Sequence, residues 1–140
     1  MKRTDKAWVR SLVGGIILLC FTGFCFILDV PMAWSQENTV NYTLTDLRFR
    51  DFSHQNLEGT SFAAAEMQGA NFREANLKNT ILTKASFLQA DLMGADFTEA
   101  FADRVNFNEA NLTNAIFTDA ILTSSRFFDA VITGADFSGA

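Results

Sequence analysis

A period of five residues runs from residue 42 to residue 140 and constrains the fold of this chain more than any other feature. Each unit holds a small residue, a short polar residue, a large apolar residue and two variable, mostly polar ones, as in Ala95-Asp96-Phe97-Thr98-Glu99. The large position recurs in twenty consecutive units without insertion or deletion, and nineteen of these positions hold a bulky apolar side chain. Because helices repeat every ~3.6 residues and strands every ~2, this period predicts stacked repeats that bury a shared core.

A right-angle turn at each unit closes one coil in four units and sends every large side chain toward one axis. Stacked coils then pair backbone to backbone about 4.8 Å apart, as neighbouring strands do. Two of the resulting columns end in three phenylalanines each, for which offset stacking adds to simple burial. The four expected columns are Tyr42, Phe62, Leu82, Ala102 and Leu122; Leu47, Met67, Phe87, Phe107 and Phe127; Phe52, Phe72, Leu92, Leu112 and Ile132; and Leu57, Leu77, Phe97, Phe117 and Phe137.

The pattern resembles the A(D/N)Lxx repeat of the pentapeptide-repeat proteins over residues 42–140. The resemblance implies an all-β solenoid, a right-handed quadrilateral β-helix of about five coils, with the large and the small residue of each unit inward. The five glycines of the repeat region all take the last position of a unit, where we expect corners with backbone angles that other residues resist. They are glycines 59, 69, 94, 134 and 139.

Residues 1–35 are typical of an export leader. Four basic and two acidic residues give this segment a charge of +2, and an uncharged, mainly apolar run follows from residue 11 to residue 28. The small residues Ala33 and Ser35 predict a signal peptide cleaved after Ser35. The same run is just long enough to be an N-terminal membrane anchor, so that alternative stays open. In both cases we expect an N-terminal apolar helix, a short linker over residues 36–41 and an extracytoplasmic repeat domain.

The positions of the cysteines and the net charge limit what kind of protein the exported product can be. Cys20 and Cys25 both lie in the leader, so a cleaved product has no thiol and no disulfide framework. Residues 36–140 hold seven basic and fourteen acidic residues, a charge of −7. The leader and repeats together resemble pentapeptide-repeat proteins of the cyanobacterial periplasm and thylakoid lumen and of the chloroplast lumen, which implies one of these compartments.

No group of residues in the repeats suggests catalysis. His54 is the only histidine, and we expect it on the surface, because no cysteine or second histidine can join it in a metal site. Coil stacking places Glu99 next to Asp119 and Glu109 next to Asp129, but paired carboxylates on a flat wall without a cleft are mostly solvated. We therefore expect no enzyme, no cofactor and no metal.

The two ends of the repeat region depart from the pattern in different ways. Thr45, Arg50 and Gln55 occupy positions that should be small, so residues 42–60 are either a cap over the open N-terminal end or a diverged coil. The pattern stays regular up to Ala140, and the exposed edge of that last coil is expected to pair with a second copy or another protein.

One apolar stripe is the candidate interaction site. Phe101 stands where Asp or Asn is expected, in one column with Ile81 and Ile121, so the three should form an outward apolar stripe. The alternative is a local bulge that tips Phe101 inward, into the space beside Ala102, which is the only undersized large position.

Two functions of different classes are consistent with these features. The first is a non-enzymatic exported scaffold, a protein-interaction module with rigid acidic faces and an unknown protein partner. The alternative is a DNA mimic that binds and protects gyrase, because the resemblance includes acidic members of that kind and the charge of −7 favours it. The leader and the lack of the C-terminal dimerisation helix of those members oppose it, and we expect no nucleic acid as a partner.

Overall fold

The computed structural model describes residues 11–13, 16–21, 24–28 and 40–140. The chain divides into two compact units, Met1–Asn38 and Thr39–Ala140. Each unit is described by itself.

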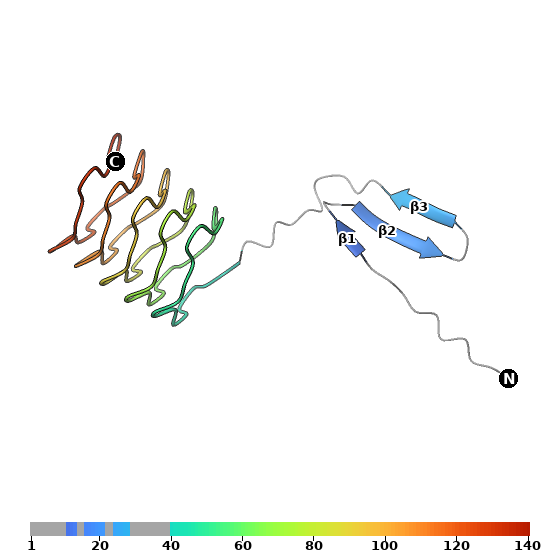
Figure 1. The fold of residues 1–140 in the computed structure, drawn as a ribbon, viewed down its shortest axis with the longest axis horizontal. Helices are drawn as coiled ribbons and strands as arrows, with labels where there is room; N and C mark the ends of the chain where they lie inside the picture. Colours follow the sequence, from blue (N-terminus) through green and yellow to red (C-terminus); the bar gives the residue numbers. More distant parts are fainter. Residues whose placement is uncertain (1–10, 14–15, 22–23, 29–39) are drawn as a thin grey trace. The chain divides into compact units, whose positions relative to one another are not determined.

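The first unit contains a three-stranded antiparallel sheet in the order β1-β2-β3 (Figure 1). Its strands are β1 (Ser11–Val13), β2 (Ile16–Phe21) and β3 (Phe24–Leu28). Leu12 pairs with Ile17, and Leu19 pairs with Phe26.

The described residues of this segment form strands and do not support the apolar helix expected there. The helix was predicted from the length and hydrophobicity of residues 11–28. Apolar runs of this kind occur both in helices and in buried strands, so they do not distinguish the two. The strands are rich in β-branched and aromatic residues, which favour a pleated backbone. No helix among the described residues is both long and apolar enough to cross a bilayer. The expected cleavage site after Ser35 lies outside the described residues.

The second unit is the expected quadrilateral β-helix (Figure 1). Its coils are joined by parallel β-bridges, in which the residue before the large one of each pentad pairs with the residue 20 positions later, from Asn41↔Ser61 to Ile116↔Asp136. The spacing of these bridges confirms a coil of four pentads. The coils comprise residues 41–60, 61–80, 81–100, 101–120 and 121–140. We call the four sides of the coils walls, and the first wall comprises residues 41–44, 61–64, 81–84, 101–104 and 121–124. The second, third and fourth walls begin five, ten and fifteen residues later, at residues 46, 51 and 56.

A tight turn makes the corner at the end of each pentad. The backbone N–H of the small residue donates to the carbonyl of the large residue three positions earlier, as Ala65 does to Phe62 at 3.0 Å. The last residue of every pentad has positive φ, from 53° at Ala64 to 74° at Gly139. A positive φ at the third turn residue is the mark of a type II turn. The corner expected from the glycines is confirmed, and fifteen residues other than glycine adopt it as well.

The core contains the four columns expected from the period. Phe97, Phe107 and Phe117 are fully buried, and the two runs of three phenylalanines stack as predicted. Large residues from opposite walls also meet edge to face across the axis, as Phe97 and Phe107 do with ring centroids 5.9 Å apart. In the first two coils the aromatic rings come from the first and third walls. At the contact of Phe72 with Phe87 they change to the second and fourth walls.

A change of residue sizes accompanies the one undersized large position. Ala102 is fully buried, and the small position of the next pentad holds Val105, which is larger than the usual alanine and is also fully buried. The usual turn bond between them is replaced by the hydroxyl of Ser125 from the next coil. Ser125 Oγ accepts from the Val105 N–H at 3.0 Å and donates to the Ala102 carbonyl at 2.5 Å. We infer that Val105 fills the room beside Ala102, so no bulge is needed there.

Candidate functional site

The short polar residue that precedes each large residue has a local structural role. Every Asp or Asn at this position accepts a hydrogen bond from the backbone N–H two residues later, as Asp96 does from Thr98 at 3.0 Å. Such bonds satisfy a turn N–H locally, which explains why short carboxylates and amides suit this position. The residues that accept are Asn41, Asp46, Asp51, Asn56, Asn71, Asn76, Asp91, Asp96, Asn106, Asn111 and Asp136.

The predicted stripe replaces this polar residue by an apolar one in three successive coils of the first wall. Ile81 bridges to Phe101, and Phe101 bridges to Ile121, so the three lie side by side. Their exposed fractions are 46%, 43% and 48%. Phe101 therefore points outward, and the alternative in which it fills the space beside Ala102 is wrong. The stripe gives up the local hydrogen bond and places large apolar side chains in water.

The two edges of the first wall carry opposite charges. Lys84 and Arg104 occupy the corner after the stripe, and both are exposed. Glu99 and Asp119 occupy the corner before the stripe and are exposed as well. The stacking of Glu99 with Asp119 follows from the sequence period alone. Their position opposite Lys84 and Arg104 across the first wall does not, because the two pairs belong to different columns of adjacent walls.

The first wall is also the only one of the four without a net negative charge. It holds Lys84 and Arg104 against Asp103, which gives +1. The other walls hold more acidic than basic residues. Their charged residues are Asp46, Arg48, Glu66, Glu109, Arg126 and Asp129 on the second wall; Asp51, Arg73, Glu74 and Asp91 on the third; and Glu58, Lys78, Asp96, Glu99, Asp119 and Asp136 on the fourth.

Ion pairs among the described residues neutralise part of the acidic surface. Arg73 Nη1 lies 2.9 Å from Asp91 Oδ2, and Lys78 Nζ lies 3.1 Å from Asp96 Oδ2. Partial burial acts to raise the pKa of Asp96, but hydrogen bonds from Thr98 and Lys78 outweigh it, so that the pKa is lowered overall. The side chain of Arg48 lowers the pKa of Asp46 to about 2.

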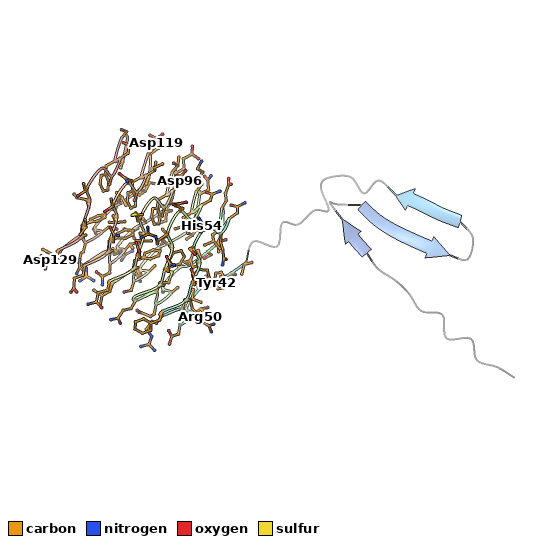
Figure 2. All side chains as sticks on the ribbon, viewed as in Figure 1. Tyr42, Arg50, His54, Asp96, Asp119 and Asp129 are labelled. Atoms are coloured by element: carbon orange, nitrogen blue, oxygen red, sulfur yellow. The ribbon has the colours of Figure 1, made fainter. Side chains whose placement is uncertain are left out.

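The other candidate residues do not form a site. His54 is exposed at the outer surface, as expected (Figure 2). Its Nδ1 lies 3.2 Å from Glu74 Oε2. Asp119 and Asp129 lie at the outer surface of the repeats (Figure 2). Across the described part of the chain, no group of three or more metal-ligating side chains comes together.

The first and last coils differ in how well they shield the core. Leu47, Phe52 and Leu57 in the first coil are buried, whereas Ile132 in the last coil is half exposed. Among the residues that the structure describes, the backbone N–H groups of Phe127 and Phe137 have no acceptor. The large residues of the last coil therefore contact water along one edge.

Comparisons with known proteins place this fold in context. The family profile named pentapeptide repeats matches residues 43–79, 70–108 and 103–140. Among curated protein sequences, none matches the chain significantly.

Solved structures of several pentapeptide-repeat proteins resemble the chain. One, from the Arabidopsis thaliana thylakoid lumen, is 35% identical with a TM-score of 0.66, and the match covers 69% of this chain and 67% of that one. HetL, involved in heterocyst differentiation regulation in Nostoc sp. strain PCC 7120, is 28% identical with a TM-score of 0.63. That match covers 74% of this chain and 52% of HetL, so the chain spans about half the length of HetL. QnrB1, a plasmid-mediated fluoroquinolone resistance protein, is 24% identical with a TM-score of 0.50, covering 71% and 61% of the two chains, and shows likeness of fold alone.

Proposed function

The chain belongs to the pentapeptide-repeat family, and from this premise we propose that it is a non-enzymatic scaffold that binds protein through the first wall of its β-helix. The observation that carries the proposal is the exposed stripe of Ile81, Phe101 and Ile121. Scattered apolar residues on a surface need no explanation, but a contiguous apolar row marks an interaction site.

Two features make this wall suitable for binding. The stripe lies on a parallel bridge ladder whose backbone is hydrogen-bonded on both sides, because Phe101 N–H donates to Thr80 and Ala102 N–H donates to Ile121. Beneath the stripe, Leu82 and Ala102 are fully buried and Leu122 is partly buried. A partner therefore meets a surface that is already ordered, which keeps the entropic cost of binding low.

We further propose that the repeats act outside the cytoplasm, in a periplasm or a thylakoid lumen. The basic start, the apolar run of residues 11–28 and the small residues near Ser35 support export. The likeness to a thylakoid-lumen protein supports the same compartments. N-terminal sequencing of the isolated protein tests the leader. A product that begins at Gln36 supports cleavage, and a full-length chain found only in membranes supports an anchor.

The binding proposal is tested by replacing the stripe with the residue that the repeat normally uses. In the variant Ile81→Asn/Phe101→Asn/Ile121→Asn, each asparagine can make the local turn bond, so the β-helix should stay folded. We expect this variant to lose the protein cross-links that the wild-type chain forms in its own compartment. Ile116→Asn, the same type of change on the fourth wall, is the matched control and should keep them. Unchanged cross-links in the stripe variant contradict the proposal.

The exposed edge of the last coil is a second surface at which we expect binding. Unpaired N–H groups on a sheet edge favour pairing with another backbone, and the self-association expected there stays a prediction. Substitution of the stripe by asparagine leaves this edge intact, so the two surfaces can be distinguished.

The alternative function, a DNA mimic that protects gyrase, rests on the acidic charge of residues 36–140. Its weakness is the distribution of that charge, since ion pairs such as Arg73 with Asp91 and Lys78 with Asp96 interrupt the acidic walls. A weaker negative potential attracts a DNA-binding cleft less strongly. The supercoiling activity of gyrase, measured with excess protein, tests this alternative, and inhibition or protection from a gyrase-directed drug would revive it.

A further inference from the structure

We infer that the partner of the first wall is a second copy of this chain, bound stripe to stripe with the two β-helices parallel. The inference rests on the proposed function and specifies its partner. It follows from three properties of the wall: its apolar stripe, its net charge and the order of charges at its two corners.

The net charge decides which wall two copies can bring together. Residues 36–140 carry −7, so two copies repel each other over most of their surface. The first wall is the exception, because Lys84 and Arg104 outweigh Asp103 there. Arg104 Nε lies 2.8 Å from Asp103 Oδ2, so the net positive charge of the wall is that of Lys84. The wall with the apolar stripe is therefore also the wall on which the charges of two copies repel each other least.

The order of charges at the corners selects one orientation. The corner before the stripe carries Glu99 and Asp119, and the corner after it carries Lys84 and Arg104. If the two-fold axis runs parallel to the β-helix axis, each basic corner faces the acidic corner of the other copy. If one copy is turned end over end, basic faces basic and acidic faces acidic, which is unfavourable. Parallel packing therefore satisfies both edges of the interface.

The two-fold symmetry also limits the assembly to a dimer. The interface is isologous, because both copies use the same wall, and no further copy can bind through that wall. In the parallel arrangement each stripe residue faces its own counterpart, with Phe101 in the middle. Residue 40 of both copies then lies at the same end of the pair, so that both chains enter from one side.

The size of the wall sets the strength of the pair. Five coils at strand spacing give a wall about 24 Å long, with three large apolar side chains. A stable interface typically buries roughly 800 Å² per partner, whereas the apolar part of this wall is a single row of three side chains. The pair is therefore weak and reversible, and its detection needs cross-linking or a high protein concentration.

The first experiment places a photo-cross-linking benzoylphenylalanine at residue 101 of the full chain, co-expressed with a second, differently tagged full-length copy. We expect a product that carries both tags. The same cross-linker at Phe128, an exposed residue of the second wall, should give much less of that product. A product at residue 101 that contains only another protein overturns the inference and leaves the proposed function standing. No cross-link at residue 101 at all overturns both.

The second experiment tests the orientation by reversing charges on separate copies. One copy carries Lys84→Glu/Arg104→Glu, and the other carries Glu99→Lys/Asp119→Lys. Each variant alone has like charges at all facing corners, so we expect the two-tag product to fall at least about tenfold. The mixture of the two variants has opposite charges at both edges and should regain it.

Circular dichroism of each variant checks that the β-helix is intact. Failure of the mixture to recover while both variants remain folded overturns the parallel arrangement. An unchanged yield of product from each single variant overturns it too.

Discussion

The rings of Phe97 and Phe117 stack in parallel on neighbouring coils, with centroids 4.7 Å apart and an interplanar angle of 1°. Both side chains are fully buried, so each ring loses its contact with water as well as gaining its neighbour. We expect Phe97→Ala to lower the free energy of unfolding by about 3–5 kcal/mol, because it leaves a cavity in a closely packed column. Chemical denaturation followed by circular dichroism measures this loss.

The matched control for this change is Phe128→Ala. Phe128 is 70% exposed, so the same truncation should change stability by less than about 1 kcal/mol. Equal losses for Phe97→Ala and Phe128→Ala contradict the packing described for the core.

Two adjacent alanines should respond to glycine with opposite signs. Ala64 has φ of 53°, a conformation that costs a residue with a side chain roughly 1–2 kcal/mol. Ala64→Gly relieves that cost and loses about 0.4–1 kcal/mol through the greater freedom of the unfolded chain. We expect a net gain of up to about 1 kcal/mol. Ala65 is fully buried without positive φ, so Ala65→Gly should destabilise. Thermal unfolding of the two variants shows whether the signs differ.

The hydroxyl of Ser125 should contribute to stability through the two bonds it makes to the coil beneath. Ser125→Ala leaves both the Val105 N–H and the Ala102 carbonyl without this partner. We expect a loss of about 1–3 kcal/mol, the usual effect of unpaired polar groups in a poorly solvated place. Ser124→Ala, at the neighbouring exposed corner, serves as the control and should have little effect. Denaturant midpoints that agree for both variants refute the bridging role.

Acid should destabilise the β-helix partly through Asp96. The pKa of this carboxyl is lowered in the folded chain: burial opposes ionisation, but hydrogen bonds from Thr98 and Lys78 outweigh it. A depressed folded pKa gives stability that is present above the unfolded value of about 3.9 and is lost as the pH falls through the folded value.

The measurement is the free energy of unfolding as a function of pH. Asp96→Asn keeps the turn acceptor and removes the titration, so its stability should fall less steeply below pH ~4 than that of the wild type. Identical slopes for the two proteins show that Asp96 does not contribute.

The sequence predicted the β-helix well because one physical signal repeats. Every large residue of the repeat points inward, so the column that contains Phe97 and Phe117 can be predicted by taking every twentieth residue. The corner conformation was visible only at glycines, yet residues such as Glu99 and Arg104 adopt it too. The repeated backbone imposes φ at each corner, whichever side chain is present.

The elements that the sequence did not predict depend on contacts between coils or on competing local preferences. The Ser125 bridge joins two coils and compensates for the turn bond absent at Ala102, a relation that no single pentad reveals. The N-terminal sheet was missed because an apolar run satisfies the templates of both helix and strand. The stripe was found, but the outward direction of Phe101 needed the position of Val105.

The β-bridges always join residues that are 20 positions apart, so the length of every coil in this β-helix is fixed. A whole coil can be removed or added while every remaining side chain keeps its wall and its corner, and its column stays continuous. A change of five or ten residues instead rotates all later pentads onto other walls, so that Ile121 no longer lies above Phe101. Insertions and deletions in this repeat region must therefore be whole coils of twenty residues if the apolar stripe is to stay in line.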